Sequence, residues 1–188
     1  MRTSIKILKE FLTNPHPKTI REIAQAINAD YKITHTATTR LIQKNILTTT
    51  TVGASTLCQR NTNYWGAEIY QAEHERTQKK LTNRNLAEIT KHITKNTPTT
   101  FYVAILFGSY ANNTQNKHSD IDILFITNQE EFEKTIQQTL QTLPQNIHAI
   151  TLTQKEYTRM KNNPEKTVVT EATKNYIILH GIEAYHQL

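Results

Sequence analysis

Apolar residues recur every three or four positions along the first 45 residues, which is the spacing of helices that bury one face. The pattern predicts a helix over residues 4–12, and the Asn14-Pro15-His16-Pro17 stretch ends it because proline cannot continue a helix. Thr19 and Glu22 form a capping box that begins a second helix. A third helix follows Asp30, and four of its apolar residues are expected to face inward: Ile33, Ala37, Leu41 and Ile42.

The next segment changes from helical spacing to a run of β-branched residues. Residues 46–52 have the composition of a strand, Gly53 lies in a turn, and residues 56–60 are expected to return as the second strand of a hairpin. Three short helices followed by a hairpin resemble a winged helix-turn-helix domain. The resemblance covers about residues 3–63.

The winged-helix resemblance implies nucleic-acid binding, because the third helix of such a domain enters the major groove. The hydroxyls and cations on the outward face of this helix suit phosphate contacts, and Arg40 has the length to reach a base edge. The residues expected on that face are Lys32, His35, Thr36, Thr39, Arg40 and Lys44. Winged helices also serve as dimerisation or protein-docking modules, and this alternative stays open.

Charge is distributed unevenly along the chain. Residues 1–80 hold 12 Lys or Arg and 6 Asp or Glu, whereas residues 81–188 hold ten of each. The whole formal net charge of +6 therefore lies in the first part. This asymmetry favours a polyanion-binding N-terminal unit, although a basic surface without a ligand has the same composition.

Two further helices are expected over residues 64–80 and 81–96, followed by a polar, proline-containing boundary at residues 97–100. We therefore expect a winged helix-turn-helix domain at residues 1–63, a helical connector at 64–97 and a second domain at 98–188. The connector is also a candidate surface for a homodimer.

The second domain begins with two apolar strands that flank polar residues. Residues 101–107 are continuously apolar and end at Gly108-Ser109, and Asp120 and Asp122 alternate with isoleucines at the start of the next apolar run. In a strand, residues two apart share a face, so both carboxylates point the same way. Adjacent carboxylates repel each other unless a cation lies between them, and Mg²⁺ would supply that cation.

The segment LFGSYANNTQNKHSDIDILFIT resembles the signature of DNA polymerase beta-like nucleotidyltransferases, and the similarity extends over about residues 101–188. The resemblance implies an α/β (α+β) domain with a small mixed sheet. It also implies transfer of a nucleoside monophosphate from a nucleoside triphosphate, with ATP as the expected donor. Gly108 and Ser109 would hold the triphosphate, and Asp120 and Asp122 would be the catalytic ligands of Mg²⁺.

The sequence departs from the family pattern in two places. Related small members usually carry an Arg-Gly pair where this chain has Asn112-Asn113, so a phosphate-facing cation is missing; Asn113 can still adopt the left-handed turn conformation. The strand expected at residues 146–152 contains no third carboxylate, and His148 is its only titratable residue. Whether His148 takes a metal or proton, or is an ordinary polar residue at a strand, stays open.

The tail is expected to complete this domain with helices. Apolar residues predict a helix over residues 130–143, and Thr153 with Glu156 forms a second capping box. A final helical stretch is expected to carry Val168 through Leu179.

Composition limits the other possibilities. No stretch approaches the length of about 20 apolar residues that spans a bilayer, the N-terminus lacks a signal peptide pattern, and Cys58 is the only cysteine. We therefore expect a cytoplasmic protein. The two resemblances imply that it is a Mg²⁺-dependent nucleotidyltransferase with a nucleic-acid-binding N-terminal domain. Two alternatives stay open: a DNA-binding regulator whose second domain senses nucleotides, and an antitoxin-like enzyme that acts on a partner toxin.

Overall fold

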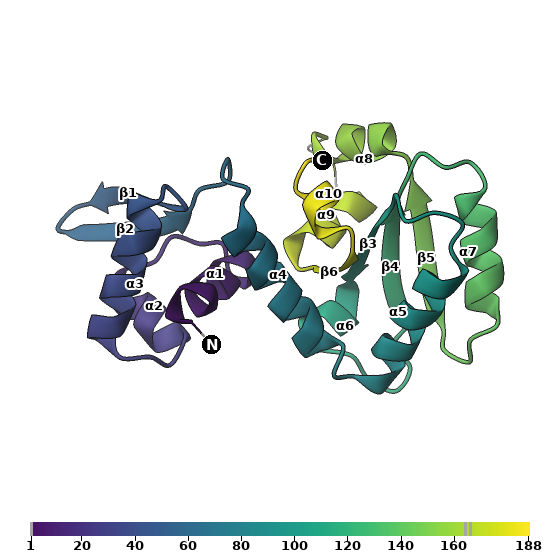
Figure 1. Ribbon diagram of the computed structural model, residues 1–188, viewed down its shortest axis with the longest axis horizontal. Coiled ribbons are helices and arrows are strands. Elements are labelled where there is room, and N and C mark those ends of the chain that lie inside the picture. The colour runs from purple at the N-terminus through teal and green to yellow at the C-terminus, as the bar shows by residue number, and fades with distance from the viewer. Residues whose placement is uncertain (1, 164, 166) are drawn as a thin grey trace. The chain divides into compact units, whose positions relative to one another are not determined.

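The computed structural model describes residues 2–163, 165 and 167–188. The chain forms two compact units, Met1–Glu75 and Arg76–Leu188, and helix α4 (Ala67–Lys80) runs through the boundary between them. Figure 1 shows the elements of both units.

The first unit is built from helices and one hairpin. Its remaining elements are α1 (Thr3–Thr13), α2 (Ile20–Ala26), α3 (Tyr31–Gln43), β1 (Leu47–Val52) and β2 (Ser55–Arg60). The capping box of Thr19 and Glu22 begins α2 as expected, and β1 pairs antiparallel with β2. The expected order of helices and strands is confirmed, while the assignment as a winged helix-turn-helix domain stays a prediction.

The inward face of α3 differs from the one expected. Ile33 is 57% exposed, and the buried residues of α3 are Thr34, Ala37, Thr38 and Leu41. The expectation for Ile33 was wrong, because Thr34 and Thr38 occupy buried positions of this face. The Thr34 hydroxyl donates a hydrogen bond to the Asp30 carbonyl oxygen at 2.8 Å, so only its methyl group has to be accommodated by the core.

The second unit contains a four-stranded mixed sheet with the strand order β5-β4-β3-β6. Strand β3 is antiparallel to β4 and β6, and β4 is parallel to β5. Its elements after α4 are α5 (Arg84–Asn96), β3 (Val103–Phe107), α6 (Gly108–Asn112), β4 (Ile121–Ile126), α7 (Phe132–Gln141), β5 (Ile147–Leu152), α8 (Gln154–Lys161), α9 (Val168–Lys174), β6 (Ile177–His180) and α10 (Ile182–Tyr185).

Helices cover both faces of this sheet (Figure 1). On one face α5 and α7 pack against the side chains of Ala104, Leu106 and Ile123. On the other face α8, α9 and α10 pack against Val103, Ile105 and Leu124. The central strands are buried on both sides, which explains why they read as continuous apolar runs.

Helix α5 belongs to the core of the second unit. We expected it in a helical connector, but its apolar residues Leu86, Ile89 and Ile93 are buried against the sheet. The polar stretch that follows α5 is therefore a loop within the unit.

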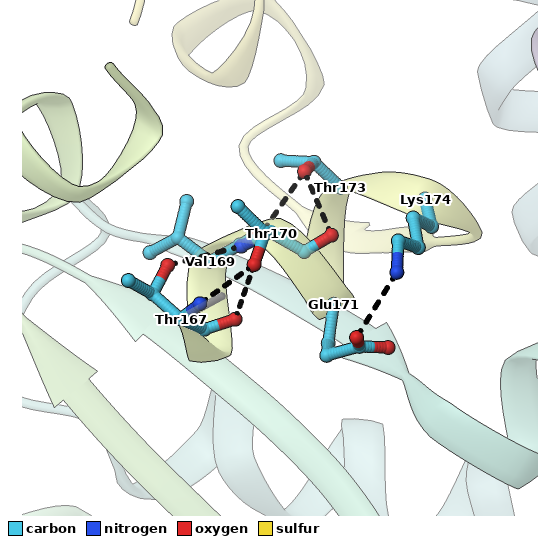
Figure 2. Close-up of polar contacts among 6 residues, drawn as sticks. All are labelled: Thr167, Val169, Thr170, Glu171, Thr173 and Lys174. Carbon is cyan, nitrogen blue, oxygen red and sulfur yellow. Dashed lines mark hydrogen bonds and ion pairs between the residues drawn. The ribbon is translucent and has the colours of Figure 1, made fainter. Parts of the chain in front are cut away.

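The expected final helix was partly wrong. Helix α9 ends at Lys174, Asn175 is extended, and Ile177–His180 form strand β6. Ile177 and Ile178 pair with Leu106 and Ile105 of β3, so they fill an edge of the sheet, a non-local contact that helical spacing does not reveal. Figure 2 shows how α9 begins, with the Thr167 and Thr170 side chains each accepting a hydrogen bond from the other residue's backbone N–H.

Candidate active site

Asp122 is the second residue of the central strand β4, and Asp120 lies just before this strand. Asp122 is half-buried, and its neighbours Ile121 and Ile123 are buried on the opposite face of the sheet. Asp120 directly precedes the strand and is exposed. The sequence alternation therefore places Asp122 on the face of the sheet that it shares with Leu124.

Gly108 brings the end of β3 against Asp122. The last residue of β3, Phe107, pairs directly with Asp122 across the antiparallel ladder. Gly108 has a φ of +68°, and a Cβ atom built there would collide with Oδ2 of Asp122. A glycine is needed here for two reasons, its left-handed backbone and the space that the carboxylate occupies.

Ser109 is the second residue of the short helix α6, where a loop was expected. Its carbonyl oxygen accepts the backbone N–H groups of Asn113 and, at 3.0 Å, of Thr114. Asn113 adopts the left-handed conformation with φ 59° and ψ 30°, as the sequence suggested. Ser109 directly follows Gly108, the residue that packs against Asp122.

His148 lies next to Asp122 on the parallel neighbour strand β5. The two residues are paired in the register of β4 and β5, and His148 Nδ1 lies 3.2 Å from Asp122 Oδ1. The His148 side chain is 61% exposed and that of Asp122 is 26% exposed. Sequence reasoning identified His148 as the titratable residue of this strand but had no means of assigning its partner.

The donor set at this site fits Mg²⁺. Mg²⁺ is commonly held by one or two carboxylates, with water and substrate phosphates completing its coordination. Asp120 and Asp122 supply two carboxylates, and Gly108 keeps the space beside Oδ2 free of a side chain. Within residues 2–163, 165 and 167–188, no cluster of three or more His, Cys, Asp or Glu residues is arranged to hold a metal ion.

One cation from a distant part of the sequence reaches the C-terminal end of α6, the helix that begins at Gly108-Ser109. Lys80, at the end of α4, places Nζ 2.7 Å from Asn113 Oδ1 and 3.5 Å from the Ala111 carbonyl oxygen. Burial lowers the pKa of the Lys80 ammonium. Sequence reasoning missed Lys80 because no local motif connects it with residues 108–113.

In the first unit, most residues expected to contact nucleic acid are accessible. Lys32, His35, Thr36 and Arg40 are exposed, and Thr39 is half-buried. Lys44 differs, because its ammonium lies 2.9 Å from Glu68 Oε1 and is already paired. The Tyr64 hydroxyl also donates to Glu68, at 2.7 Å, so this carboxylate is fixed by two donors.

A basic groove of about 580 Å³ lies between the start of α1 and α3. The cations Arg2, Lys32 and Arg40 line it together with hydroxyl groups and apolar side chains. Its other lining residues are Thr3, Ser4, Ile33, Thr36 and Ala37. None of the described residues that line this groove is acidic.

Among the described residues, none of the helices has the length and apolar character needed to cross a membrane.

Residues 87–181 match the family described as Polymerase beta, Nucleotidyltransferase. No curated protein and no solved structure is matched. The family match covers 95 of the 188 residues and includes the Gly-Ser turn, both aspartates and all four strands of the sheet. The chain therefore belongs to the polymerase beta nucleotidyltransferase family.

Proposed function

We propose that the protein transfers a nucleoside monophosphate from a nucleoside triphosphate, with ATP as the expected donor, to an acceptor hydroxyl. The observation that carries this proposal is the packing of Gly108 against the Asp122 carboxylate, which brings the Gly-Ser turn beside the aspartate strand. Nucleotidyl transfer needs the phosphate-binding residues and the metal-binding carboxylates close together, because both act on the same triphosphate.

Each residue of the site has a distinct task in this reaction. Asp120 and Asp122 would hold Mg²⁺, which when bound neutralises the phosphates and polarises the reacting centre. The Ser109 hydroxyl would donate to a phosphate oxygen, and Gly108 lets the backbone approach the phosphates closely. The acceptor hydroxyl oxygen attacks the α-phosphorus in line and forms a new P–O bond, and its proton passes to solvent water. The bond to the bridging oxygen breaks, and pyrophosphate leaves with that electron pair.

The first unit supports binding of nucleic acid. Lys32, Thr36 and Arg40 are accessible, and the groove beside them adds Arg2, with no acidic residue among the described residues of its lining. Phosphate contacts depend on such cations, and a nucleic acid held there would be an acceptor or an anchor for the transferase. The exposed face of one helix also has the size that the major groove of B-DNA admits.

A second candidate function is a DNA-binding regulator whose nucleotidyltransferase unit senses nucleotides without turning them over. The absence of an acidic residue from β5, where His148 stands beside Asp122, favours this candidate. Both functions require nucleotide binding, so binding alone does not distinguish them.

The experiment that separates them is label transfer from nucleoside triphosphates labelled at the α-phosphate, in the presence of Mg²⁺. A transferase moves the label covalently to an acceptor, and Asp122→Asn abolishes this movement. A sensor binds the labelled nucleotide and releases it unchanged.

A further inference from the structure

The segment that would receive the triphosphate, made of α6 and its flanking residues, has no positive charge of its own. From Phe107 to Asn116 the chain contains no lysine and no arginine. A triphosphate bound by this segment would meet no positive charge from it. The strong hydrogen bonds in phosphate recognition are those whose donor carries a charge. A cation from another part of the same unit would fill this need.

Helix α4 places such a cation at this segment. Two residues of α4 anchor its second half, because Arg76 donates to the Tyr176 carbonyl oxygen at 2.8 Å and Thr77 donates to that of Ile178 at 2.7 Å. The start of β6 lies beside the end of β3, with Ile177 opposite Leu106. Lys80 follows Arg76 by one helical turn on the same side of α4, and its ammonium lies at Ala111 and Asn113, the C-terminal end of the short helix that begins at Gly108.

The Lys80 ammonium is held there by neutral partners. Its two hydrogen-bond acceptors are Asn113 Oδ1 and the Ala111 carbonyl oxygen, and no carboxylate of the described residues pairs with it. Lys18 and Lys44, by contrast, lie 3.5 and 2.9 Å from the carboxylates of Glu10 and Glu68. Lys80 is half-buried, and this burial lowers its pKa because no negative charge offsets the desolvation of the ammonium.

Asn113 connects Lys80 to Ser109 through two hydrogen bonds. Asn113, which accepts the hydrogen bond from Lys80, donates its backbone N–H to the Ser109 carbonyl oxygen. An ammonium has three donors, so two contacts with neutral oxygens leave one N–H for a further acceptor. A phosphate oxygen would supply both that acceptor and the missing negative charge.

We propose that Lys80 is a phosphate-binding residue that contacts the polyphosphate of the nucleoside triphosphate at the Gly108-Ser109 turn. This inference rests on the proposed function, since it assumes that the triphosphate binds at this turn. In this proposal, α4 supplies the positive charge that residues 107–116 lack.

The test measures binding of ATP and of AMP, in Mg²⁺, by calorimetric titration of the full chain. Lys80→Met removes the charge, and Lys79→Met removes an exposed charge from the neighbouring position of the same helix. The account predicts that Lys80→Met weakens ATP binding about tenfold or more and changes AMP binding little. Lys79→Met and Lys80→Arg should bind ATP within about twofold of the unmodified protein.

Asn113→Gly separates direct contact from an indirect structural role. Glycine adopts the left-handed conformation of Asn113 freely, but it lacks the oxygen that accepts from Lys80. If Lys80 contacts phosphate, Asn113→Gly keeps ATP affinity; if Lys80 only holds Asn113 in place, both variants lose affinity equally, and the proposal is overturned. Thermal unfolding should show Lys80→Met to be as stable as the unmodified protein, since the variant removes a half-buried charge.

The remaining outcomes distinguish this proposal from the proposed function. Unchanged ATP binding by Lys80→Met overturns the role of Lys80 and leaves the transferase proposal standing. If the folded, unmodified protein binds none of ATP, GTP, CTP and UTP, the proposed function fails, and the role of Lys80 fails with it.

Discussion

His148 Nδ1 lies 3.2 Å from Oδ1 of Asp122, and the two residues face each other across the parallel strands β4 and β5. The other oxygen of this carboxylate, Oδ2, lies at Gly108. The Asp122 side chain is therefore restrained on both sides, by an imidazole on one oxygen and by backbone on the other. Such contacts orient a carboxylate that would bind a metal ion.

We expect His148→Ala to lower the rate of nucleotidyl transfer by roughly tenfold, because Asp122 would lose the partner that fixes its orientation. His148→Asn should retain most of the activity, since its amide keeps a donor near the Nδ1 position. Steady-state kinetics of both variants provide the measurement, with His92→Ala as a control in the same unit. Equal activity of His148→Ala and the unmodified protein would contradict this role.

Gly108→Ala should abolish transfer, because the new methyl group would occupy the space of Asp122 Oδ2 and push the carboxylate away. The left-handed backbone adds a strain of about 1–2 kcal/mol. Gly53→Ala is the matched control, since Gly53 also has a positive φ, of +58°, but its Cβ would meet nothing within 4 Å. Both variants should lower the free energy of unfolding in urea, and only Gly108→Ala should lose activity. Full transfer by a folded Gly108→Ala protein would show that the close packing is not needed.

The double variant Lys32→Gln/Arg40→Gln should weaken binding of nucleic acid and reduce its salt dependence. Each lost phosphate contact lowers the slope of log K against log salt by about one. Fluorescence anisotropy with labelled duplex DNA and with labelled RNA, at several salt concentrations, gives this slope.

Lys91→Gln/Lys95→Gln is the charge-matched control, since it removes two exposed cations from α5. Lys44→Gln should have a smaller effect than the change at Arg40, because Glu68 already engages the Lys44 ammonium. If the control weakens binding as much as the Lys32 and Arg40 changes, only net charge matters and α3 has no specific role.

Glu68 makes the stability of the first unit sensitive to acid. The hydrogen bonds from Lys44 and Tyr64 lower the pKa of Glu68 from 4.5 to about 2. The contribution of a carboxylate with a lowered pKa is present above pH 4.5 and is lost as the pH falls toward 2. We expect Glu68→Gln to cost about 1–2 kcal/mol at pH 7, and this cost should shrink as the pH approaches 2.

Trp65 is the only tryptophan and lies in the first unit, where Arg60 stacks on its ring at 4.9 Å. Urea unfolding followed by its fluorescence, at pH 7 and at pH 3, therefore reports on this unit. A destabilisation by Glu68→Gln that is the same at both pH values would exclude the titration of Glu68 as its cause.

The sequence predicted the parts of the site that depend on local patterns. The alternation of Asp120 and Asp122 with isoleucines indicated a strand with its carboxylates on one face, and β4 confirms the strand. The capping boxes of Thr19 and Thr153 marked the starts of α2 and α8, because both partners lie within four residues of each other.

The remaining features depend on contacts between distant segments. The pairing of His148 with Asp122 requires the register of two parallel strands, and the contact of Lys80 with Asn113 requires the path of α4. Ile177–His180 form a strand only because the edge of β3 is free to pair with them. Hydrophobic spacing within one segment carries no information on any of these three relationships.

The central claim is that Asp122 takes part in nucleotidyl transfer, and label transfer tests it most directly. Each nucleoside triphosphate, labelled at the α-phosphate, is incubated with Mg²⁺, the protein and a host lysate separated into RNA, DNA, protein and small-molecule fractions. Asp122→Asn is compared with Asp30→Asn, a matched change at the N-cap of α3, where asparagine caps as well as aspartate. The account predicts covalent label in one fraction with the unmodified protein and with Asp30→Asn, and none with Asp122→Asn. Labelling that survives Asp122→Asn, or no labelling by a folded protein that binds the nucleotide, would contradict the claim.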